Sequence, residues 1–345
     1  MANWIRPAYS RAEVRRAGEA LRDANLGLPQ ALEVRQARDV ADNWRAAHGY
    51  PLNTVQLMLR RHAIGVDPSA VIAQRLKRFP SIEKKLRRFP TMQLHSMQDL
   101  GGCRAIVAGV GEVDAVVDRF RKSPGKQILK SEFDYLRARL REDGYRSHHL
   151  VIQSRSAARP EFDDMLVEVQ ARTQLQHAWA TCVETIDFFG KQGLKTGGGD
   201  AEWRRFFALM GAELALAEGL PLQDGVQTHK RERRREIKQL ARQLDVLNRL
   251  SSYAFTAQQV SGGRRGHVTL HLHFQKGSTV LDIQHYGTIR DATKAYDALE
   301  ARSSGDSSQD IALVRVADVR SLQLAYPNYF ADTLRFSNEV ARAIL

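Results

Sequence analysis

The chain has 345 residues, of which 43% are hydrophobic and 26% charged, so it is long enough for one large domain or two ordinary domains with real cores. Its 52 basic and 39 acidic residues leave a formal charge of +13, which favours polyphosphate or nucleic-acid partners over neutral metabolites. The two cysteines exclude a disulfide framework and a four-cysteine zinc site, and the lack of a long apolar run or a secretory signal predicts a cytoplasmic protein without a membrane anchor.

The first half of the chain is predicted to form helices followed by a sheet. Residues 11–61 are rich in Ala, Leu and Arg with few helix breakers, which predicts two or three amphipathic helices. Three later segments have the apolar character of strands: GGCRAIVAGV at 101–110, HHLVIQ at 148–153 and DMLVEVQAR at 164–172. We expect helices between them, at residues 112–122 and 131–142. The alternation predicts an α+β fold, with a mixed sheet covered by helices.

The predicted strand at 164–172 has two different faces. Its apolar face would carry Val167, Val169 and Ala171. Its polar face would carry Glu168, Gln170 and Arg172. A polar strand face of this kind requires water or a ligand against it.

The second half begins with helices and ends in a smaller module. The helix TQLQHAWATCVETIDFFG is predicted to end at Gly190, and KTGGGD separates it from a second helix, AEWRRFFALMGAELALAEG. The basic segment THKRERRREIK predicts a linking helix. After it, HVTLHLHF and STVLDIQHY alternate like hairpin strands, with a helix near 288–301 and a third strand, IALVRVA. We therefore predict three parts, at residues 1–220, 221–250 and 251–345.

The densest basic stretch lies at residues 60–88, where nine Lys or Arg face only Asp67 and Glu83. Within it, RLKRFPSIEKKLRR brings four polar residues close together along the chain, namely Arg75, Lys77, Ser81 and Lys85. The stretch is either a solvated helix face, as charge runs usually are, or a phosphate-binding site.

Two carboxylates lie in or beside predicted strands. QDLGGCR places Asp99 just before a strand and Arg104 inside it, so that Asp99 is either a turn former paired with Arg104 or part of a site. Glu168, in a central strand, needs a compensating cation, and Arg172 could supply it as a plain ion pair. Two carboxylates that face lysines and arginines are also the arrangement that holds Mg²⁺ and a nucleoside triphosphate.

Aromatic and histidine residues suggest two further sites. GYRSHH at 144–149 places Tyr145 directly before a strand, where it would stack on a base, an interaction worth about 1–3 kcal/mol, or serve as a core tyrosine. In the C-terminal hairpin, His267, His271 and His273 alternate on one strand face as metal ligands do, but no cysteine lies near them.

Taken in order, these segments resemble the synthetase domain of the RelA/SpoT alarmone family, over residues 50–200. The family pattern R-x-K-x-x-x-S-x-x-x-K is met by Arg75, Lys77, Ser81 and Lys85, and D-x-x-G-x-R by Asp99, Gly102 and Arg104. G-Y-[RK]-S-x-H is met by GYRSHH, and E-x-Q-x-R-T by Glu168, Gln170, Arg172 and Thr173. Four motifs in this order are far more specific than any one of them.

The resemblance implies a nucleotidyltransferase-like fold and transfer of the β,γ-pyrophosphate of ATP to a ribose hydroxyl, with Mg²⁺ as cofactor. By motif, Arg75, Lys77, Ser81 and Lys85 would bind the ATP phosphates, and Arg104 would pack on adenine. Asp99 would hold Mg²⁺, and Glu168 would complete the metal site or help to deprotonate the attacking hydroxyl. Gln170 would join them at the catalytic centre, and Tyr145, Arg146, His149 and Arg172 would bind the acceptor.

Two departures from the family pattern bear on activity. No histidine–aspartate hydrolase motif precedes the synthetase region, so the resemblance implies synthesis without removal of the product. Ahead of Gly144, SEFDYLRARLREDGY lacks the proline-lysine segment that many members carry near the acceptor site, which leaves the acceptor open.

A second resemblance concerns the C-terminal part. The helices LQHAWATCVETIDFF and WRRFFALM, with the ending Y-x-x-Y, are similar to fused toxic small alarmone synthetases of the CapRel type. There a pseudo-zinc-finger module acts as a tethered antitoxin whose tyrosine pair blocks the ATP site. A phage capsid protein releases the block, and the enzyme pyrophosphorylates the CCA end of tRNA. The resemblance assigns the blocking role to Tyr326 and Tyr329, although AYPNYFADT also reads as a plain helix start at Pro327.

Three functions are consistent with these observations. The first is an autoinhibited, tRNA-modifying anti-phage toxin, with Arg121, Lys122, Lys126 and Lys130 as a basic surface for RNA. The second is a small alarmone synthetase that makes guanosine tetra- or pentaphosphate from GDP or GTP. The third is an RNA-binding regulator without catalysis, against which the complete set of Asp99, Arg104, Tyr145 and Glu168 argues.

Overall fold

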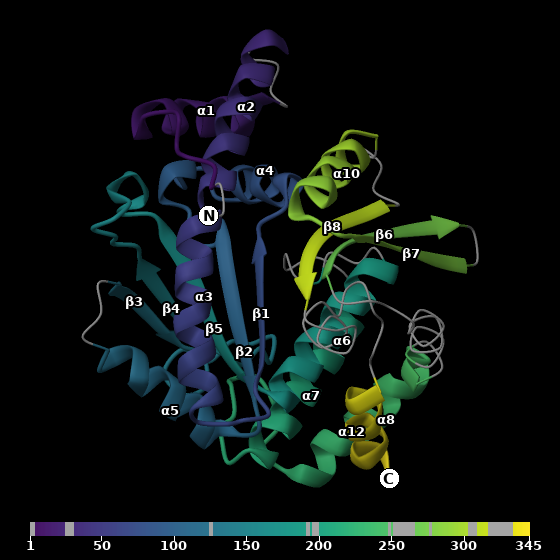
Figure 1. Cartoon of the computed structure of the whole chain (residues 1–345). Coiled ribbons are helices and arrows are strands. Elements are labelled where there is room, and N and C mark those ends of the chain that lie inside the picture. The colour runs from purple at the N-terminus through teal and green to yellow at the C-terminus, as the bar shows by residue number, and fades with distance from the viewer. Residues whose placement is uncertain are drawn as a thin grey trace. The chain divides into compact units, whose positions relative to one another are not determined.

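The computed structural model describes residues 4–24, 31–123, 127–190, 194, 200–247, 250, 266–275, 278–302, 309–316 and 334–345 (Figure 1). Contacts divide the chain into two units. The first comprises Met1–Ala105, Gly111–Phe133 and His148–Ala171, and the second comprises Ile106–Val110, Asp134–Ser147 and Arg172–Leu345. The predicted division at residues 220 and 250 stays a prediction.

The first unit opens with the helices predicted for residues 11–61. They are α1 (Arg11–Asp23), α2 (Ala31–Ala47) and α3 (Gly49–Ile64), and the later helix α4 (Phe79–Arg88) packs against α1. A capping box begins α1, because the Ser10 hydroxyl accepts from the Glu13 amide while the Glu13 carboxylate accepts from the Ser10 amide. Val14, Leu21 and Trp44 are buried in the core that these helices share.

The main sheet has five strands and is mixed, as predicted. They are β1 (Val71–Leu76), β2 (Gly101–Val107), β3 (Ile128–Asp134), β4 (His148–Gln153) and β5 (Leu166–Thr173), in the order β1-β2-β5-β4-β3. β4 and β5 run antiparallel, with His149 opposite Gln170 and Val151 opposite Glu168. The three predicted strands are confirmed, whereas the two edge strands, β1 and β3, had no clear sequence signal.

Helices flank this sheet. α3 lies along one of its faces and contacts β1 (Figure 1). α5 (Val110–Arg121) confirms the helix predicted at residues 112–122. Two short 3₁₀ turns, η2 (Leu94–Ser96) and η3 (Pro160–Phe162), complete the connections of this unit.

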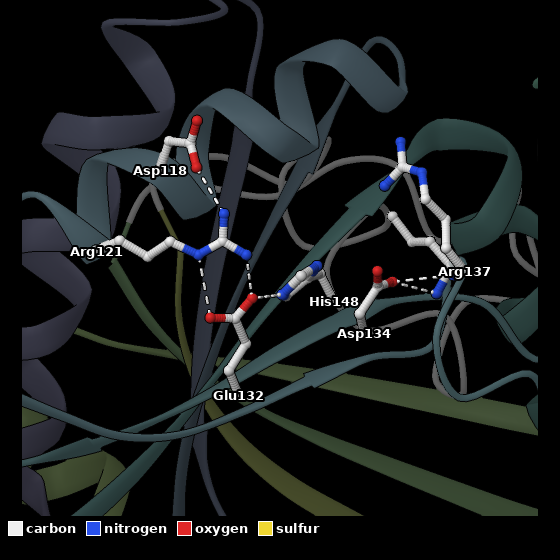
Figure 2. Close-up of polar contacts among 7 residues, drawn as sticks. Asp118, Arg121, Glu132, Asp134, Arg137 and His148 are labelled. Atoms are coloured by element: carbon white, nitrogen blue, oxygen red, sulfur yellow. Dashed lines mark hydrogen bonds and ion pairs between the residues drawn. The ribbon is translucent and has the colours of Figure 1, made fainter.

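The helix predicted at residues 131–142 is wrong. Ile128–Asp134 forms the edge strand β3, and the chain then turns. The Asp134 carboxylate accepts from the amides of Leu136 and Arg137 at 2.7 and 3.0 Å, which closes an Asx-type turn directly after the strand (Figure 2). Pairing with β4 and this turn supply the hydrogen bonds that a helix would have made, so they override the local helix propensity.

The second unit contains a helical core. Its helices are α6 (Gln174–Gly190), α7 (Ala201–Ala217), α8 (Lys230–Gln243) and α12 (Leu334–Ile344). Trp179, Phe206, Ile237 and Phe336, one from each helix, are buried in a single cluster. α8 is therefore a helix, as predicted, and its apolar side packs into this core. Its Arg233 is also buried, where it pairs with Glu213 of α7 at 2.6 Å.

The second unit also contains a three-stranded antiparallel sheet. β6 (Gly266–Gln275) lies between β7 (Ser278–Tyr286) and β8 (Gln309–Val316), and α10 (Ile289–Arg302) packs on them. The predicted hairpin, helix and third strand are confirmed. In Figure 1 these four elements are coloured from green to yellow.

Candidate active site

Asp99 lies just before β2 and binds two lysines from different elements. Lys77 directly follows β1, and its Nζ is 2.7 Å from Oδ2 of Asp99. Lys85, on α4, places its Nζ 2.8 Å from Oδ1. The Lys77 amide donates to the carbonyl oxygen of Leu100 at 2.8 Å, which fixes the end of β1 against the start of β2. The basic stretch and Asp99, separate in sequence, therefore meet in one ion-pair group.

The electrostatics of this group keep Asp99 ionised although it is largely buried. Burial and the charge of Glu168 raise the pKa of its carboxyl, but Lys77 and Lys85 outweigh them, so that the net shift is downward. Burial lowers the pKa of Lys77, which Asp99 opposes, and the charges of Lys85 and Arg75 lower it further. Because the charge of Arg75 acts on the pKa of Lys77, the exposed side chain of Arg75 lies near this ion-pair group.

Glu168 sits on β5 with two hydrogen-bonding neighbours. Gln170, two residues along the strand, donates to Oε2 at 2.7 Å, and Nδ1 of His149, on β4, lies 3.1 Å from Oε1. Val167 and Val169, on the opposite side of β5, are fully buried, which confirms the predicted division of the strand into an apolar and a polar face. The structure thus brings Glu168, Gln170 and His149 together as a second polar group.

The surroundings of Glu168 favour its charged form. Burial raises the pKa of its carboxyl, but the hydrogen bond and charge of His149, the bond from Gln170 and the charge of Lys85 lower it to about 2. Such a carboxylate is ionised at neutral pH and accepts a proton poorly, so it is better suited to hold a cation than to act as a general base.

Asp99 and Glu168 fit the requirements of Mg²⁺, which proteins commonly hold with one or two carboxylates together with substrate phosphates. Both are ionised, and the charge of Glu168 acts on Asp99 directly. A bound magnesium ion would neutralise charge on the phosphates during transfer. Within the described ranges, no group of three or more His, Cys, Asp and Glu side chains is placed to hold a metal ion, and His271 of the C-terminal hairpin belongs to no such group. The side chains of His267 and His273 lie outside those ranges.

The remaining ATP-binding candidates lie on the same elements. Ser81 is in the first turn of α4, four residues before Lys85. Arg104 alternates on β2 with the buried Cys103 and Ala105, and its own side chain is half-buried. Their contacts with ATP phosphates and adenine stay predictions.

In the second unit, Tyr145 lies among arginines. Its hydroxyl accepts from the guanidinium of Arg172 at 2.6 Å, and the ring centroid is 5.1 Å from Cζ of Arg172 and 5.5 Å from Cζ of Arg141. Asp143 accepts from the Tyr145 amide at 3.0 Å and also binds Arg141. Guanidinium groups and base planes both favour aromatic faces, and stacking of a nucleobase on Tyr145 stays a prediction. Sequence reasoning missed Asp143, since an acidic residue before a glycine signals only a turn.

Arg146 has a structural position. It is 3% exposed, and its Nη2 donates to the carbonyl oxygen of Pro221 and to Oε1 of Gln223, both at 2.9 Å. Gln223 in turn donates to the carbonyl oxygen of Ala208 at 2.8 Å. These bonds tie the GYRSHH segment to the loop after α7, and Gln223 had no sequence signal. A direct contact of Arg146 with an acceptor stays a prediction.

The predicted RNA-binding residues differ in their surroundings. Arg121 binds the carboxylates of Asp118 and Glu132, and Glu132 also accepts from His148 at 2.7 Å (Figure 2). The positive charge of Arg121 is therefore already balanced by two acidic groups. Lys122 and Lys130 are exposed, and Lys126 lies outside the described residues. The two lysines are better placed than Arg121 to meet phosphates.

Two further predictions concern the C-terminal tyrosine pair and the lack of a membrane span. Tyr326 and Tyr329, the predicted autoinhibitory pair, lie outside the described residues. A search of the helices that are described found none both long and apolar enough to cross a membrane.

Residues 74–188 match the family model described as "Region found in RelA / SpoT proteins". The matched segment runs from β1 to α6 and contains Asp99, its two lysines, Glu168 and Arg172. This segment is therefore similar to the region that RelA and SpoT proteins share.

Individual proteins also show similarity to this chain. The chain is 29% identical over 124 residues to the GTP pyrophosphokinase YjbM of Bacillus subtilis (strain 168), a match that spans 35% of this chain and 58% of that relative. Among solved structures, the small alarmone synthetase 1 of Bacillus subtilis bound to its product pppGpp is 21% identical, with a TM-score of 0.42 over 52% of this chain and 94% of that one. A GTP pyrophosphokinase family protein from Streptococcus pneumoniae is 23% identical, with a TM-score of 0.41 over 55% and 93%.

Proposed function

We propose that the protein is a pyrophosphokinase that uses ATP and Mg²⁺. The observation that carries this proposal is the partly buried group of Asp99, Lys77 and Lys85, whose charges are coupled to Glu168 within the segment that matches RelA and SpoT proteins. Such a group offers oxygen ligands to a divalent cation and ammonium donors to phosphates, and phosphoryl-type transfer depends mainly on positioning and charge neutralisation.

In the proposed reaction, a ribose hydroxyl oxygen of the acceptor forms a bond to the β-phosphorus of ATP. The bond from that phosphorus to the oxygen bridging to the α-phosphate breaks, so AMP leaves and the hydroxyl proton is released. Lys77 and Lys85 would bind the transferred phosphates, with Arg75, Ser81 and Arg104 beside them. Gln170 and His149 orient the Glu168 carboxylate, which supplies negative charge at the reaction centre. Tyr145 and Arg172 would position the acceptor.

For the acceptor, we propose the CCA end of tRNA. The net charge of +13 and the exposed Lys122 and Lys130 support an RNA partner. Stacking on Tyr145 suits an unpaired terminal base. The second candidate is a guanosine nucleotide, which would make the protein a small alarmone synthetase. It is favoured by the match to a GTP pyrophosphokinase.

Regulation forms part of the same proposal. The C-terminal module would restrain the enzyme through Tyr326 and Tyr329, as an intramolecular antitoxin, and a phage protein such as the major capsid protein would release it. The support is the sequence resemblance together with the presence of a separate small sheet, β6 to β8.

Labelled ATP separates these alternatives. We expect the full chain with Tyr326→Ala and Tyr329→Ala, incubated with γ-labelled ATP, to transfer label to bulk tRNA. Label on GDP or GTP alone would establish the second candidate, and label on neither would reject the enzymatic proposal. Expression of the double tyrosine variant should be toxic to the host cell, and a harmless double variant would reject the autoinhibition.

The catalytic assignment is tested in the same assay. Glu168→Gln removes the central charge while preserving its shape, so transfer should fall by about 10²-fold or more. Glu232→Gln makes the same change at an exposed position on α8 and should leave transfer unchanged. Equal activity of the two variants would contradict a catalytic role for Glu168.

A further inference from the structure

Both oxygens of the Asp99 carboxylate are already taken by protein cations. Lys77 binds Oδ2 at 2.7 Å and Lys85 binds Oδ1 at 2.8 Å. The side chain of Lys77 is only 13% exposed, that of Asp99 20% and that of Lys85 27%. A divalent cation that approaches Asp99 therefore meets an ion-pair group that is complete and largely shielded from water.

The charges of this group explain why a metal ion alone would bind poorly. Asp99 and Glu168 carry two negative charges, and Lys77 and Lys85 carry two positive charges, so the four side chains sum to zero. A magnesium ion that bound an oxygen of Asp99 would compete with an ammonium group for that oxygen and would place a double positive charge next to it. In a partly buried site, an unpaired charge next to a like charge is strongly unfavourable.

A triphosphate removes this obstacle because it brings its own negative oxygens. Each lysine can exchange a carboxylate oxygen for a phosphate oxygen and keep a charge-assisted hydrogen bond. Arg75, exposed and electrostatically coupled to Lys77, adds a further cation for the same phosphates. Asp99 is then left to the metal ion.

We propose that Lys77 and Lys85 form a lysine latch on Asp99, which opens for a divalent cation only when nucleotide polyphosphate takes over the two lysines. This inference rests on the proposed function, because the ligand that opens the latch is the donor nucleotide. Metal ion and nucleotide then bind cooperatively, and by linkage each strengthens the other by the same factor. Without nucleotide, the site therefore does not take up metal ions from the cell.

The test measures metal binding rather than turnover. Mn²⁺ is the probe, and the electron paramagnetic resonance signal of the free ion reports how much remains unbound. The full chain is titrated with Mn²⁺ in the absence and presence of α,β-methylene-ATP, and a titration of the analogue without protein corrects for the Mn²⁺ that the analogue itself chelates. For the wild-type chain we expect the analogue to tighten Mn²⁺ binding by about tenfold or more.

Variants on α4 assign the effect to the latch. Lys85→Gln should tighten nucleotide-free Mn²⁺ binding by about tenfold, and Asp99→Asn in the same chain should abolish that gain. Lys84→Gln, at the exposed neighbouring position, removes an equal charge and should leave nucleotide-free binding as in the wild type. Lys85→Arg retains the cation and should also bind Mn²⁺ weakly. Circular dichroism establishes that each variant is folded.

The outcomes separate this inference from the proposed function. Equal nucleotide-free Mn²⁺ affinity in wild-type, Lys85→Gln and Lys84→Gln chains overturns the latch, even if the analogue binds. Failure of the wild-type chain to bind the analogue with Mn²⁺ present overturns the proposed function. Even in that case, the Mn²⁺ affinities of the variants without nucleotide show whether the lysines block Asp99.

Discussion

Buried ionisable residues in this protein keep or lose their charge according to the partners that reach them. Glu168 stays charged, with its pKa lowered to about 2, because donors from His149 and Gln170 and the charge of Lys85 outweigh its burial. His48 is the opposite case. Burial lowers its pKa to about 4, and its Nδ1 donates to the carbonyl oxygen of Trp44 at 2.8 Å, a bond that a neutral ring can make.

His48 therefore predicts a stability that depends on pH. Its pKa falls from the ordinary 6.5 to about 4 on folding, so between these values the unfolded chain binds the extra proton and stability drops as the pH falls. Between pH 7 and pH 5 the loss due to His48 is about 2 kcal/mol. Urea unfolding of the wild type and His48→Gln at both pH values should show that their difference shrinks by this amount on acidification. A constant difference would show that His48 does not titrate in this way.

The loop that carries Tyr145 packs against helix α7 through two glycines. Gly144 has φ +86°, a conformation that other residues rarely adopt. A Cβ added to Gly211 of α7 would lie 2.6 Å from the carbonyl oxygen of Gly144 and 2.7 Å from its Cα. Both near atoms belong to the backbone, so the loop itself would have to move.

Gly211→Ala should therefore displace the Tyr145 loop. We expect a loss of about 1–3 kcal/mol in the free energy of unfolding, as for other overpacked positions, and weaker acceptor binding with ATP binding retained. Gly111→Ala on α5, where a new Cβ would meet nothing within 4 Å, is the matched control. Urea unfolding and the separate Michaelis constants for acceptor and ATP measure the two effects. A stable Gly211→Ala variant would contradict the close approach seen here.

For the molecule as a whole, the C-terminal helix belongs to the core of the second unit. Phe336 of α12 lies 5.9 Å from the ring of Phe207 and 6.4 Å from that of Phe206, measured between centroids. Phe336 and Val340 are buried together with Ile237 of α8. The β6–β8 sheet thus lies in sequence between two helices that share one core, and a truncation at residue 250 would remove part of that core.

Phe336→Ala should therefore cost about 3–5 kcal/mol of unfolding free energy, the usual range for a fully buried phenylalanine. Leu334→Ala, on the same helix but 59% exposed, should change stability by about 0.5 kcal/mol or less. Urea unfolding of the full chain measures both. If the two variants lost equal stability, α12 would not pack as described. Point variants of Tyr326 and Tyr329 are accordingly a cleaner test of autoinhibition than deletion of the C-terminal part.

Much of the central sheet and the candidate site residues could be predicted from the sequence. Short apolar runs located β2 and β4, and β5 also showed an apolar face and a polar face, because side chains alternate between the two faces of a strand. The charged motifs and their resemblance to a known family singled out Asp99, Lys77, Lys85 and Glu168 as candidates, and the chemical roles of these residues stay predictions. Local patterns failed at β3, where the residues favour a helix and pairing with β4 decides otherwise.

The folded structure shows which charged residues neutralise one another, because most of these pairs join different elements, although Asp118 and Arg121 are three residues apart on one helix. It paired Lys77 and Lys85 with Asp99, enclosed Arg146 beside Gln223 and balanced Arg121 with Asp118 and Glu132. It also placed α8 and α12 in one core, since a helix's apolar side shows that it is buried but not what it is buried against.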